Sequence, residues 1–383
     1  MTWLFSEMKI LIAPNTFKES LSAPEVCEAI RVGILAAGFE GEIVSVPMAD
    51  GGDGTMNALV ASTGGEIRSV TVSDPLGRPV EAAFGLLGDG RTAVVEMAQA
   101  SGLWRLSPVE RNPLLTSTRG TGELIATALR AGASTVIVGI GGSATNDGGA
   151  GMAQALGYRF LDADSKEVEG IGGALCRISR IDASGVMPEL FSARIRVACD
   201  VENPLLGPRG ATRVYGPQKG ATGEMFDRLE AGLANLAYLW ESDLGISVKD
   251  RPGAGAAGGL GAGLVAFCGA KLEPGFDLVA EVSGLRKALD GADLVLTGEG
   301  RVDASTAFGK VPTGVARLVC AAGIPVVCLT GDIAGNCANL HECGITAIFP
   351  IVRGPVTLET SMNEAARSIA LSTEQVIRLW MRR

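Results

Sequence analysis

The stretch from Val136 to Gly151, VIVGIGGSATNDGGAG, begins with an apolar, β-branched run that is typical of a buried strand. It continues into glycines mixed with Ser143, Asn146 and Asp147, and the residues from Met152 onward favour a helix. A strand that leads through a glycine-rich turn to a helix N-terminus presents backbone N–H groups at the positive end of the helix dipole. The stretch is therefore either an anion-binding cradle or a tight turn whose glycines supply positive φ angles.

Strands and helices alternate near both ends of the chain. This alternation predicts parallel strands joined by helices, with the strands at residues 9–14, 42–47, 293–297, 325–329 and 347–351. The middle of the chain, after Gly65, has a different pattern. Its short predicted strands are joined by turns such as SDPLGRP, which favour antiparallel pairing.

This contrast predicts an α/β protein with two domains. Residues 8–68 and 286–383 are expected to form one α/β domain with a parallel sheet, and residues 69–285 an inserted α+β domain. Residues 1–7 are expected to be an extension, because Met8 would be a natural start. A length of 383 residues agrees with two hydrophobic cores.

Composition and charge exclude several classes of function. A net charge of -9 without a Lys/Arg block argues against binding to nucleic acid. No apolar run approaches the roughly 20 residues that a membrane helix needs. The eight cysteines form no CxxC pair, which favours reduced thiols and a cytoplasmic location. His341 is the single histidine. This excludes a multi-histidine zinc site, and it excludes any Ser-His-Asp triad that does not use His341.

Acidic residues follow four of the predicted strands. Because ligands of open α/β sheets bind outside the carboxyl ends of the strands, these acids are candidates for holding Mg²⁺ or acting as a base. Asp beside Gly is also ordinary turn chemistry, so a single loop of this kind could be purely structural. The loops are ADGGDGT with Asp50 and Asp53, ACDVENP with Asp200, TGEGRVD with Glu299 and Asp303, and TGD with Asp332.

Basic side chains stand in polar or glycine-flanked loops. Transfer of a phosphoryl group needs positive charge around its oxygens, which Lys18, Lys219, Arg301 or Lys310 could supply. Each of them could instead be an ordinary solvated side chain. No GxxxxGK[ST] P-loop occurs, and the GxGxxA pattern at residues 139–144 lacks the acid of a dinucleotide-binding fold at the expected distance.

Seven blocks of sequence occur in a consistent order: KILIAPNTFKESLSAPEV, PMADGGDGT, GIGGSATNDGGAG, ACDVENPLLGPRGA, YGPQKGA, AAGGLGAG and LTGEGRVDAST…GKVP. With these blocks the chain closely resembles the type I glycerate kinase family, from Met8 to its end. The resemblance implies ATP-dependent phosphorylation of D-glycerate to 2-phosphoglycerate, with Mg²⁺. It also implies a Rossmann-like terminal domain and an active site in the cleft between the domains. The composition and charge described above predict no nucleic-acid or membrane partner. A homodimer is left open as the oligomeric state.

The resemblance suggests roles for the acceptor-binding and catalytic residues. Asp50 or Asp200 is the expected base that deprotonates the attacking hydroxyl, with Asp53 as the second choice. The glycerate carboxylate is expected at Asn15, Lys18 and Arg301.

Metal and nucleotide roles follow in the same way. Mg²⁺ is expected at Asp200, Glu299 and Asp303. The residues expected to bind the ATP phosphates are Gly141, Gly142, Ser143, Asn146, Asp147, Gly258 and Gly259, with Lys219 or Lys310 neutralising charge.

Other functions stay open at this point. Transfer to the 3-hydroxyl would give 3-phosphoglycerate. An NAD(P)-linked hydroxyacid dehydrogenase and a non-catalytic sensor of nucleotides or metabolites are the alternatives from other classes.

Overall fold

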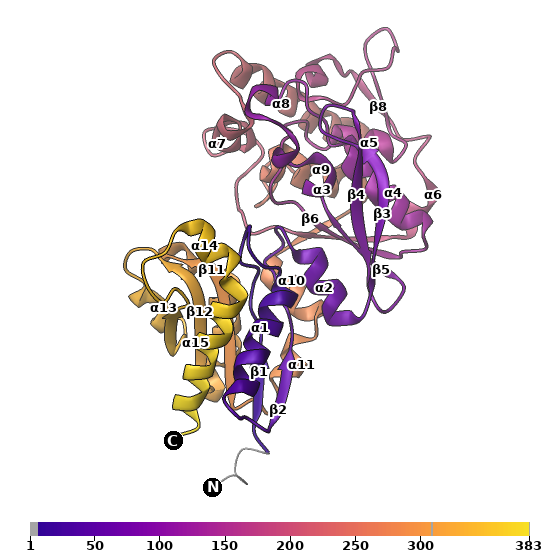
Figure 1. The fold of residues 1–383 in the computed structure, drawn as a ribbon. Coiled ribbons are helices and arrows are strands. Elements are labelled where there is room, and N and C mark those ends of the chain that lie inside the picture. The colour runs from indigo at the N-terminus through magenta and orange to yellow at the C-terminus, as the bar shows by residue number, and fades with distance from the viewer. Residues whose placement is uncertain (1–6, 308, 383) are drawn as a thin grey trace. The chain divides into compact units, whose positions relative to one another are not determined.

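The computed structural model describes residues 7–307 and 309–382 (Figure 1). These residues form two compact units. The first unit runs to Asp50 and includes Asn57–Gly64 and the chain from Phe276 onward, and the second comprises Gly51–Met56 and Gly65–Gly275. The domain boundaries at residues 68–69 and 285–286, and the cleft expected between the domains, stay predictions. Of the expected extension, residues 1–6 lie outside the described part of the chain.

A parallel sheet with the strand order β13–β12–β11–β1–β2 forms the centre of the first unit. Residues Ile10, Leu11 and Ile12 of its middle region are completely buried, as expected for a parallel sheet covered on both faces. The prediction of an α/β fold with a parallel sheet is confirmed. The strands are β1 (Lys9–Ile12), β2 (Glu42–Ser45), β11 (Leu294–Val302), β12 (Val326–Ile333) and β13 (Ala347–Pro350).

Helices α1 (Ala23–Ala36) and α15 (Ala365–Trp380) pack side by side in this unit (Figure 1). A Cβ atom on Gly33 would lie 2.3 Å from the backbone oxygen of Ala370, so a glycine is needed where the two helices meet. Helix α1 begins at the predicted capping box, in which the Ser22 N–H and hydroxyl donate to the Glu25 carboxylate at 2.7 Å. The other helices that contribute to the unit are α2 (Thr55–Thr63), α10 (Gly275–Val282), α11 (Leu285–Leu289), α12 (Val311–Val319), α13 (Ala338–Glu342) and α14 (Leu358–Asn363).

Strands β11 and β12 continue through segments that the sequence analysis interpreted as exit loops. That interpretation was wrong, because Glu299 pairs with Thr330 and Arg301 with Asp332 in the parallel ladder. A Cβ atom on Gly298 would lie 2.3 Å from the carbonyl oxygen of Leu329. The glycine of TGEGRVD that looked like a turn signal therefore permits a close approach between two strands.

A mixed sheet with the strand order β10–β9–β6–β5–β4–β3 forms the centre of the second unit. The antiparallel pairing expected after Gly65 is confirmed for β3, β4 and β5, whereas β5, β6, β9 and β10 run parallel. Strands β7 (Arg159–Leu161) and β8 (Arg180–Asp182) form a separate antiparallel pair. The strands of the mixed sheet are β3 (Glu66–Ser73), β4 (Pro79–Leu86), β5 (Thr92–Glu96), β6 (Thr135–Gly139), β9 (Arg194–Ala198) and β10 (Lys271–Glu273).

The core of the second unit is aromatic at its centre. Trp240 and Phe160 pack edge-on against Phe267, each with ring centroids 5.8 Å apart. None of the helices within residues 7–307 and 309–382 combines the length and apolar character that crossing a bilayer requires. The helices of this unit are α3 (Ala98–Ser101), α4 (Arg119–Arg130), α5 (Ala150–Ala155), α6 (Pro188–Ser192), α7 (Ala211–Tyr215), α8 (Met225–Leu244) and α9 (Leu260–Cys268).

Candidate active site

A cavity of about 570 Å³ lies at the carboxyl edge of the parallel sheet in the first unit. Ligands of open α/β sheets bind at this edge, so the cavity is the candidate active site. Each charged or amide side chain that lines it, apart from Glu19, is a candidate from the sequence, with Asp332 named only as an acid that follows a predicted strand. The residues with an assigned role are Asn15, Lys18, Asp50, Glu299, Arg301, Asp303 and Lys310.

The loop after β1 brings an amide and an ammonium group to the cavity. The Asn15 N–H donates to the Gly298 carbonyl at 2.8 Å, which continues the ladder between β1 and β11. The side-chain oxygen of Asn15 accepts the Thr16 N–H at 2.8 Å. Asn15 is buried by this arrangement, whereas Lys18 in the following turn is exposed. The amide of Asn15 is thus held in one orientation, with its NH₂ group available as a donor.

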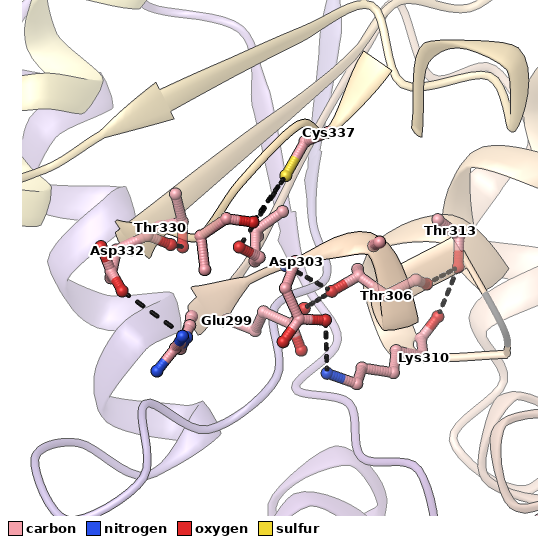
Figure 2. Close-up of polar contacts among 12 residues, drawn as sticks. Glu299, Asp303, Thr306, Lys310, Thr313, Thr330, Asp332 and Cys337 are labelled. Atoms are coloured by element: carbon pink, nitrogen blue, oxygen red, sulfur yellow. Dashed lines mark hydrogen bonds and ion pairs between the residues drawn. The ribbon is translucent and has the colours of Figure 1, made fainter. Parts of the chain in front are cut away.

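Glu299 is a buried carboxylate at the cavity. It shares one face of β11 with Arg301, because side chains two residues apart in a strand point the same way. Glu299 is 6% exposed, and burial raises the pKa of its carboxyl, with Asp50 and Asp303 adding to the rise. The Thr306 hydroxyl donates to Glu299 Oε1 at 2.7 Å and opposes part of that rise (Figure 2).

Asp303 and Lys310 face each other across a turn that Thr306 organises. Figure 2 shows the Asp303 carboxylate directed toward the Lys310 ammonium group, and the two lie 4.0 Å apart. The Thr306 hydroxyl also accepts the Asp303 N–H at 3.2 Å, and the Thr306 carbonyl accepts the Thr313 hydroxyl at 2.7 Å. These bonds hold the turn against the first residues of α12 and place Lys310 at its start.

The cavity therefore combines acidic and basic groups that suit two different tasks. Arg301 and Lys310 each lie near a carboxylate, with Arg301 Nε 3.6 Å from Asp332. Such cations bind substrate carboxylates and phosphates, while carboxylates accept a proton or hold a metal ion. In the described residues, no group of three or more Cys, His, Asp and Glu side chains is arranged as a metal site. Because Mg²⁺ usually takes one or two carboxylates plus phosphate oxygens and water, Glu299 and Asp303 fit it as a pair.

Asp53 and Asp200, the other candidates for the base, belong to the second unit. The Asp200 carboxylate accepts the Gly275 N–H at 2.7 Å. Asp53 lies in an exposed turn, and a Cβ atom on Gly142 would come within 3.7 Å of its Oδ1. The three residues expected to bind Mg²⁺ are thus divided between the units, and only Glu299 and Asp303 share a cavity within one unit.

Glu96 is a candidate that the sequence analysis missed. It ends strand β5, is 6% exposed, and accepts the Met56 N–H at 2.8 Å. Burial raises the pKa of its carboxyl, and the charge of Asp53 adds to the rise. The sequence does carry a signal, because an acid directly follows the apolar residues of TAVVE at the carboxyl end of a strand.

The stretch Val136–Gly151 forms the end of β6 and the start of α5, as predicted, but its polar side chains are buried. Lys219, only 1% exposed, donates to the Ser143 hydroxyl and to the Thr145 carbonyl, both at 2.7 Å. Burial lowers the pKa of Lys219 to about 7, and the nearby charge of Asp147 opposes this. The hydrogen bonds of Lys219 thus hold the protein's own glycine-rich turn from inside.

Asp147 fastens this turn to the starts of two helices. Its carboxylate accepts the N–H and the hydroxyl of Thr118 at 2.7 Å, and the N–H groups of Gly149 and Gly151 at 3.2 Å. Thr118 directly precedes α4, and the two glycines flank the start of α5. Burial raises the pKa of Asp147, while these hydrogen bonds lower it. This gives Asp147 a structural role that the sequence analysis did not foresee, and Asn146 beside it donates to the Thr212 hydroxyl at 3.0 Å.

The two glycine-rich segments expected to bind phosphates pack against each other. Gly258 and Gly259 have φ angles of +70° and +89°, and a Cβ atom on Gly258 would lie 2.0 Å from the Thr145 carbonyl oxygen. Both are buried, whereas Gly141 and Gly142 are exposed. Close packing thus accounts for the buried pair, and the exposed pair keeps its expected role as a prediction.

Apolar residues of the cavity were also missed, because nothing in their local sequence marks a binding site. They are Phe17, Ile351, Leu358, Met362 and Ala365.

Comparison with known proteins gives matches over nearly the whole chain. A model of the glycerate kinase family matches residues 10–381. A Bacillus subtilis (strain 168) protein named glycerate kinase is 50% identical over 359 residues, which are 94% of either chain. The glycerate 2-kinase of Escherichia coli (strain K12) is 46% identical over 369 residues, or 96% of this chain and 97% of the relative.

A solved structure agrees with these relatives. A crystal structure from Salmonella typhimurium LT2, provisionally named glycerate kinase 2, superposes with a TM-score of 0.91 at 46% identity. The superposition covers 98% of this chain and 99% of the other. Sequence and structure agree over both units, and the chain belongs to the glycerate kinase family.

Proposed function

We propose that this glycerate kinase uses ATP and Mg²⁺ to phosphorylate the 2-hydroxyl of D-glycerate, giving 2-phosphoglycerate and ADP. The name of the relative from Escherichia coli, glycerate 2-kinase, supports the choice of hydroxyl. The observation that carries the proposal is the cavity of the first unit. It combines cations for two anionic substrates with carboxylates for proton transfer.

The glycerate carboxylate is proposed to bind at Asn15, Lys18 and Arg301. Arg301 offers the forked donor that grips a carboxylate at two points, and Lys18 adds positive charge. The NH₂ group of Asn15 is already oriented by the bond between its side-chain oxygen and Thr16. Substrate binding at these residues leaves the hydroxyl groups of glycerate facing the acids of the cavity.

Asp50 is the proposed general base. It follows β2 on the carboxyl edge of the sheet and lines the same cavity as Glu299. As the 2-oxygen attacks the γ-phosphorus, its proton passes to the Asp50 carboxylate, and the bond from the γ-phosphorus to the leaving oxygen of ADP breaks. Asp200 and Asp53 keep their place as alternative bases in the second unit.

Glu299 and Asp303 are the residues that would hold Mg²⁺ in this cavity, with Asp200 as a further ligand in the prediction. When bound, the ion supplies positive charge against the oxygens of the transferred phosphoryl group. Lys310 lies beside Asp303 and adds charge of the same sign. Burial raises the pKa of the Glu299 carboxyl, whereas a nearby cation such as Lys310 favours its ionised form.

A reducing compartment is proposed from the thiols. All the cysteines of the chain lie in the described part and are free, including the exposed Cys176 and Cys320. Free thiols in this number suit the cytoplasm, which agrees with small phosphorylated metabolites as substrates and products.

The test is a product analysis. Purified protein is incubated with ATP, Mg²⁺ and D-glycerate, and the products are read by ³¹P NMR, which distinguishes the 2- and 3-phosphoglycerate signals. We expect 2-phosphoglycerate together with ADP. A 3-phosphoglycerate signal would reject the choice of hydroxyl, and ATP left unconsumed would reject the phosphoryl transfer itself.

A further inference from the structure

The cavity of the first unit changes its chemical character along the sheet. In the strand order β2–β1–β11–β12–β13, Asp50 follows β2 and the acid Glu299 stands on β11. At the other edge, Ile351 directly follows β13, and the wall continues with Leu358 and Met362 of α14. One side of the cavity is therefore charged and the other is largely apolar.

The proposed acceptor explains only the charged side. Glycerate has three carbons, each bearing oxygen, so it offers no apolar surface for Leu358 or Ile351 to contact. The cavity volume of about 570 Å³ falls within the range of roughly 300–1,000 Å³ typical of sites for much larger ligands. Four strand spacings separate β2 from β13, about 19 Å in all, which is far more than a three-carbon acid can span.

The apolar side has the properties of a nucleoside site. Ile351 and Ala365 are 1% and 3% exposed and form the buried floor of the apolar side. Leu358 is 76% exposed although it is a large hydrophobic residue that lines the cavity. Ser361, half-buried between Leu358 and Met362 in α14, contributes a hydroxyl that can serve a base or a ribose. A planar base would cover Leu358 and gain contact with the apolar wall.

We propose that the wall formed by Ile351, Leu358, Ser361, Met362 and Ala365 binds the nucleoside of the phosphoryl donor. The inference rests on the proposed use of ATP. The base and ribose then lie toward β13, and the phosphates extend toward Lys310 and Glu299 at the charged side. The transferred group thereby reaches the part of the cavity where the acceptor is proposed to bind.

The experiment separates the nucleoside from the phosphates. Isothermal titration calorimetry on the full chain measures binding of ADP with Mg²⁺ and, separately, of inorganic pyrophosphate with Mg²⁺. Leu358→Gln replaces an exposed apolar side chain of the wall with a polar one. Ser361→Phe places a bulky side chain in the space beside the wall. Leu379→Gln is the matched control, because Leu379 is similarly exposed at 71% and does not line the cavity.

We expect Leu358→Gln and Ser361→Phe each to weaken ADP binding by roughly ten-fold, as for other losses of apolar contact in a pocket. Leu358→Gln should leave pyrophosphate binding and the KM for D-glycerate unchanged. Leu379→Gln should leave all three quantities unchanged. Circular dichroism verifies that each variant is folded, and two variants at different positions guard against misfolding of one.

The proposal is overturned if both variants bind ADP as the unaltered protein does, or if they raise the KM for D-glycerate while ADP binding is unchanged. It is also overturned if the unaltered protein binds no ADP. Failure of the proposed function has a different signature, because the unaltered protein would then form no phosphoglycerate in the ³¹P NMR assay, whatever the variants do to ADP binding.

Discussion

Lys219 is an amine placed where water does not reach. Its ammonium group is held by the Ser143 hydroxyl and the Thr145 carbonyl, and burial lowers its pKa to about 7. The unfolded chain has the ordinary lysine pKa of about 10.4. Between these values the folded protein binds fewer protons than the unfolded chain, so the free energy of unfolding rises with pH.

Lys219→Met makes this contribution measurable. Between pH 7 and pH 9, we expect the free energy of unfolding of the unaltered protein to rise by about 2 to 3 kcal/mol relative to that of the Lys219→Met variant. One pH unit corresponds to about 1.4 kcal/mol for one proton. Urea denaturation at several pH values gives the difference. Lys287→Met, at an exposed lysine of α11, is the matched control for the loss of one lysine side chain. A difference for Lys219→Met that does not change between pH 7 and pH 9 would refute the lowered pKa.

Asp50→Asn tests the proposed base. The amide keeps the shape of the side chain but cannot accept the hydroxyl proton, so we expect kcat to fall by about two to four decades. Steady-state kinetics with ATP and D-glycerate measure the change, and circular dichroism shows whether the fold is intact. Asp277→Asn, at an exposed acid of α10, should leave kcat unchanged. Turnover within ten-fold of normal in Asp50→Asn would move the base to Asp200 or Asp53.

Single residues show how far sequence reasoning reaches. The residues that could be selected from the sequence are Asn15, Lys18, Asp50, Glu299 and Arg301, because polar side chains at the carboxyl ends of parallel strands gather at one edge of the sheet. The burial of Asp147 and Lys219 could not, because it depends on contacts among segments far apart in the chain. The local sequence shows which side chains can carry charge, but their exposure to solvent depends on the fold.

At the scale of elements, glycine is the residue type that led to a wrong strand boundary. In TGEGRVD it suggested the end of a strand, yet β11 continues to Val302 because Gly298 lets the neighbouring strand approach closely. At Gly258 the same residue type has a left-handed φ of +70° and also avoids a clash with the Thr145 carbonyl. Turn chemistry and close packing select glycine for different reasons, and a single sequence does not separate them.

Gly258→Ala and Gly269→Ala separate the two reasons by experiment. Both glycines have positive φ, but a Cβ atom on Gly258 would lie 2.0 Å from a carbonyl oxygen, whereas a Cβ atom on Gly269 meets nothing within 4 Å. We expect Gly269→Ala to lower the free energy of unfolding by about 1 kcal/mol and Gly258→Ala by about 2 to 5 kcal/mol. Urea denaturation measures both values. Equal losses would contradict the packing role of Gly258.

At the scale of the whole molecule, acid sensitivity depends in part on a buried ion pair of the second unit. Arg196 on β9 donates to Glu273 on β10 at 2.7 and 3.0 Å, and both side chains are largely buried. The hydrogen bond from Arg196, with further help from Lys271, lowers the pKa of Glu273 to about 2. The pair therefore stabilises the fold above the ordinary glutamate pKa, and this contribution is lost as the pH falls toward 2.

Glu273→Gln should weaken the dependence of the unfolding free energy on pH in this acidic range. We expect the variant to lose up to about 3 kcal/mol of unfolding free energy at pH 7, with the loss shrinking between pH 4.5 and pH 2. Thermal denaturation across this range, followed by circular dichroism, measures the change. Glu40→Gln, at an exposed glutamate, serves as the control. A loss that is the same at pH 3 and pH 7 would show that charge does not cause it.

The strand β1 also determines the order in which the molecule can be completed during synthesis. The Lys9 N–H donates to a carboxylate 284 residues further along, and β1 pairs with β11. The segment Gly65–Gly275, in contrast, finds its sheet partners within itself. On the ribosome this middle segment can fold while the apolar Ile10–Ile12 still lacks β11. We expect chaperones that bind exposed apolar strands to bind this segment and to hold it until β11 has been made.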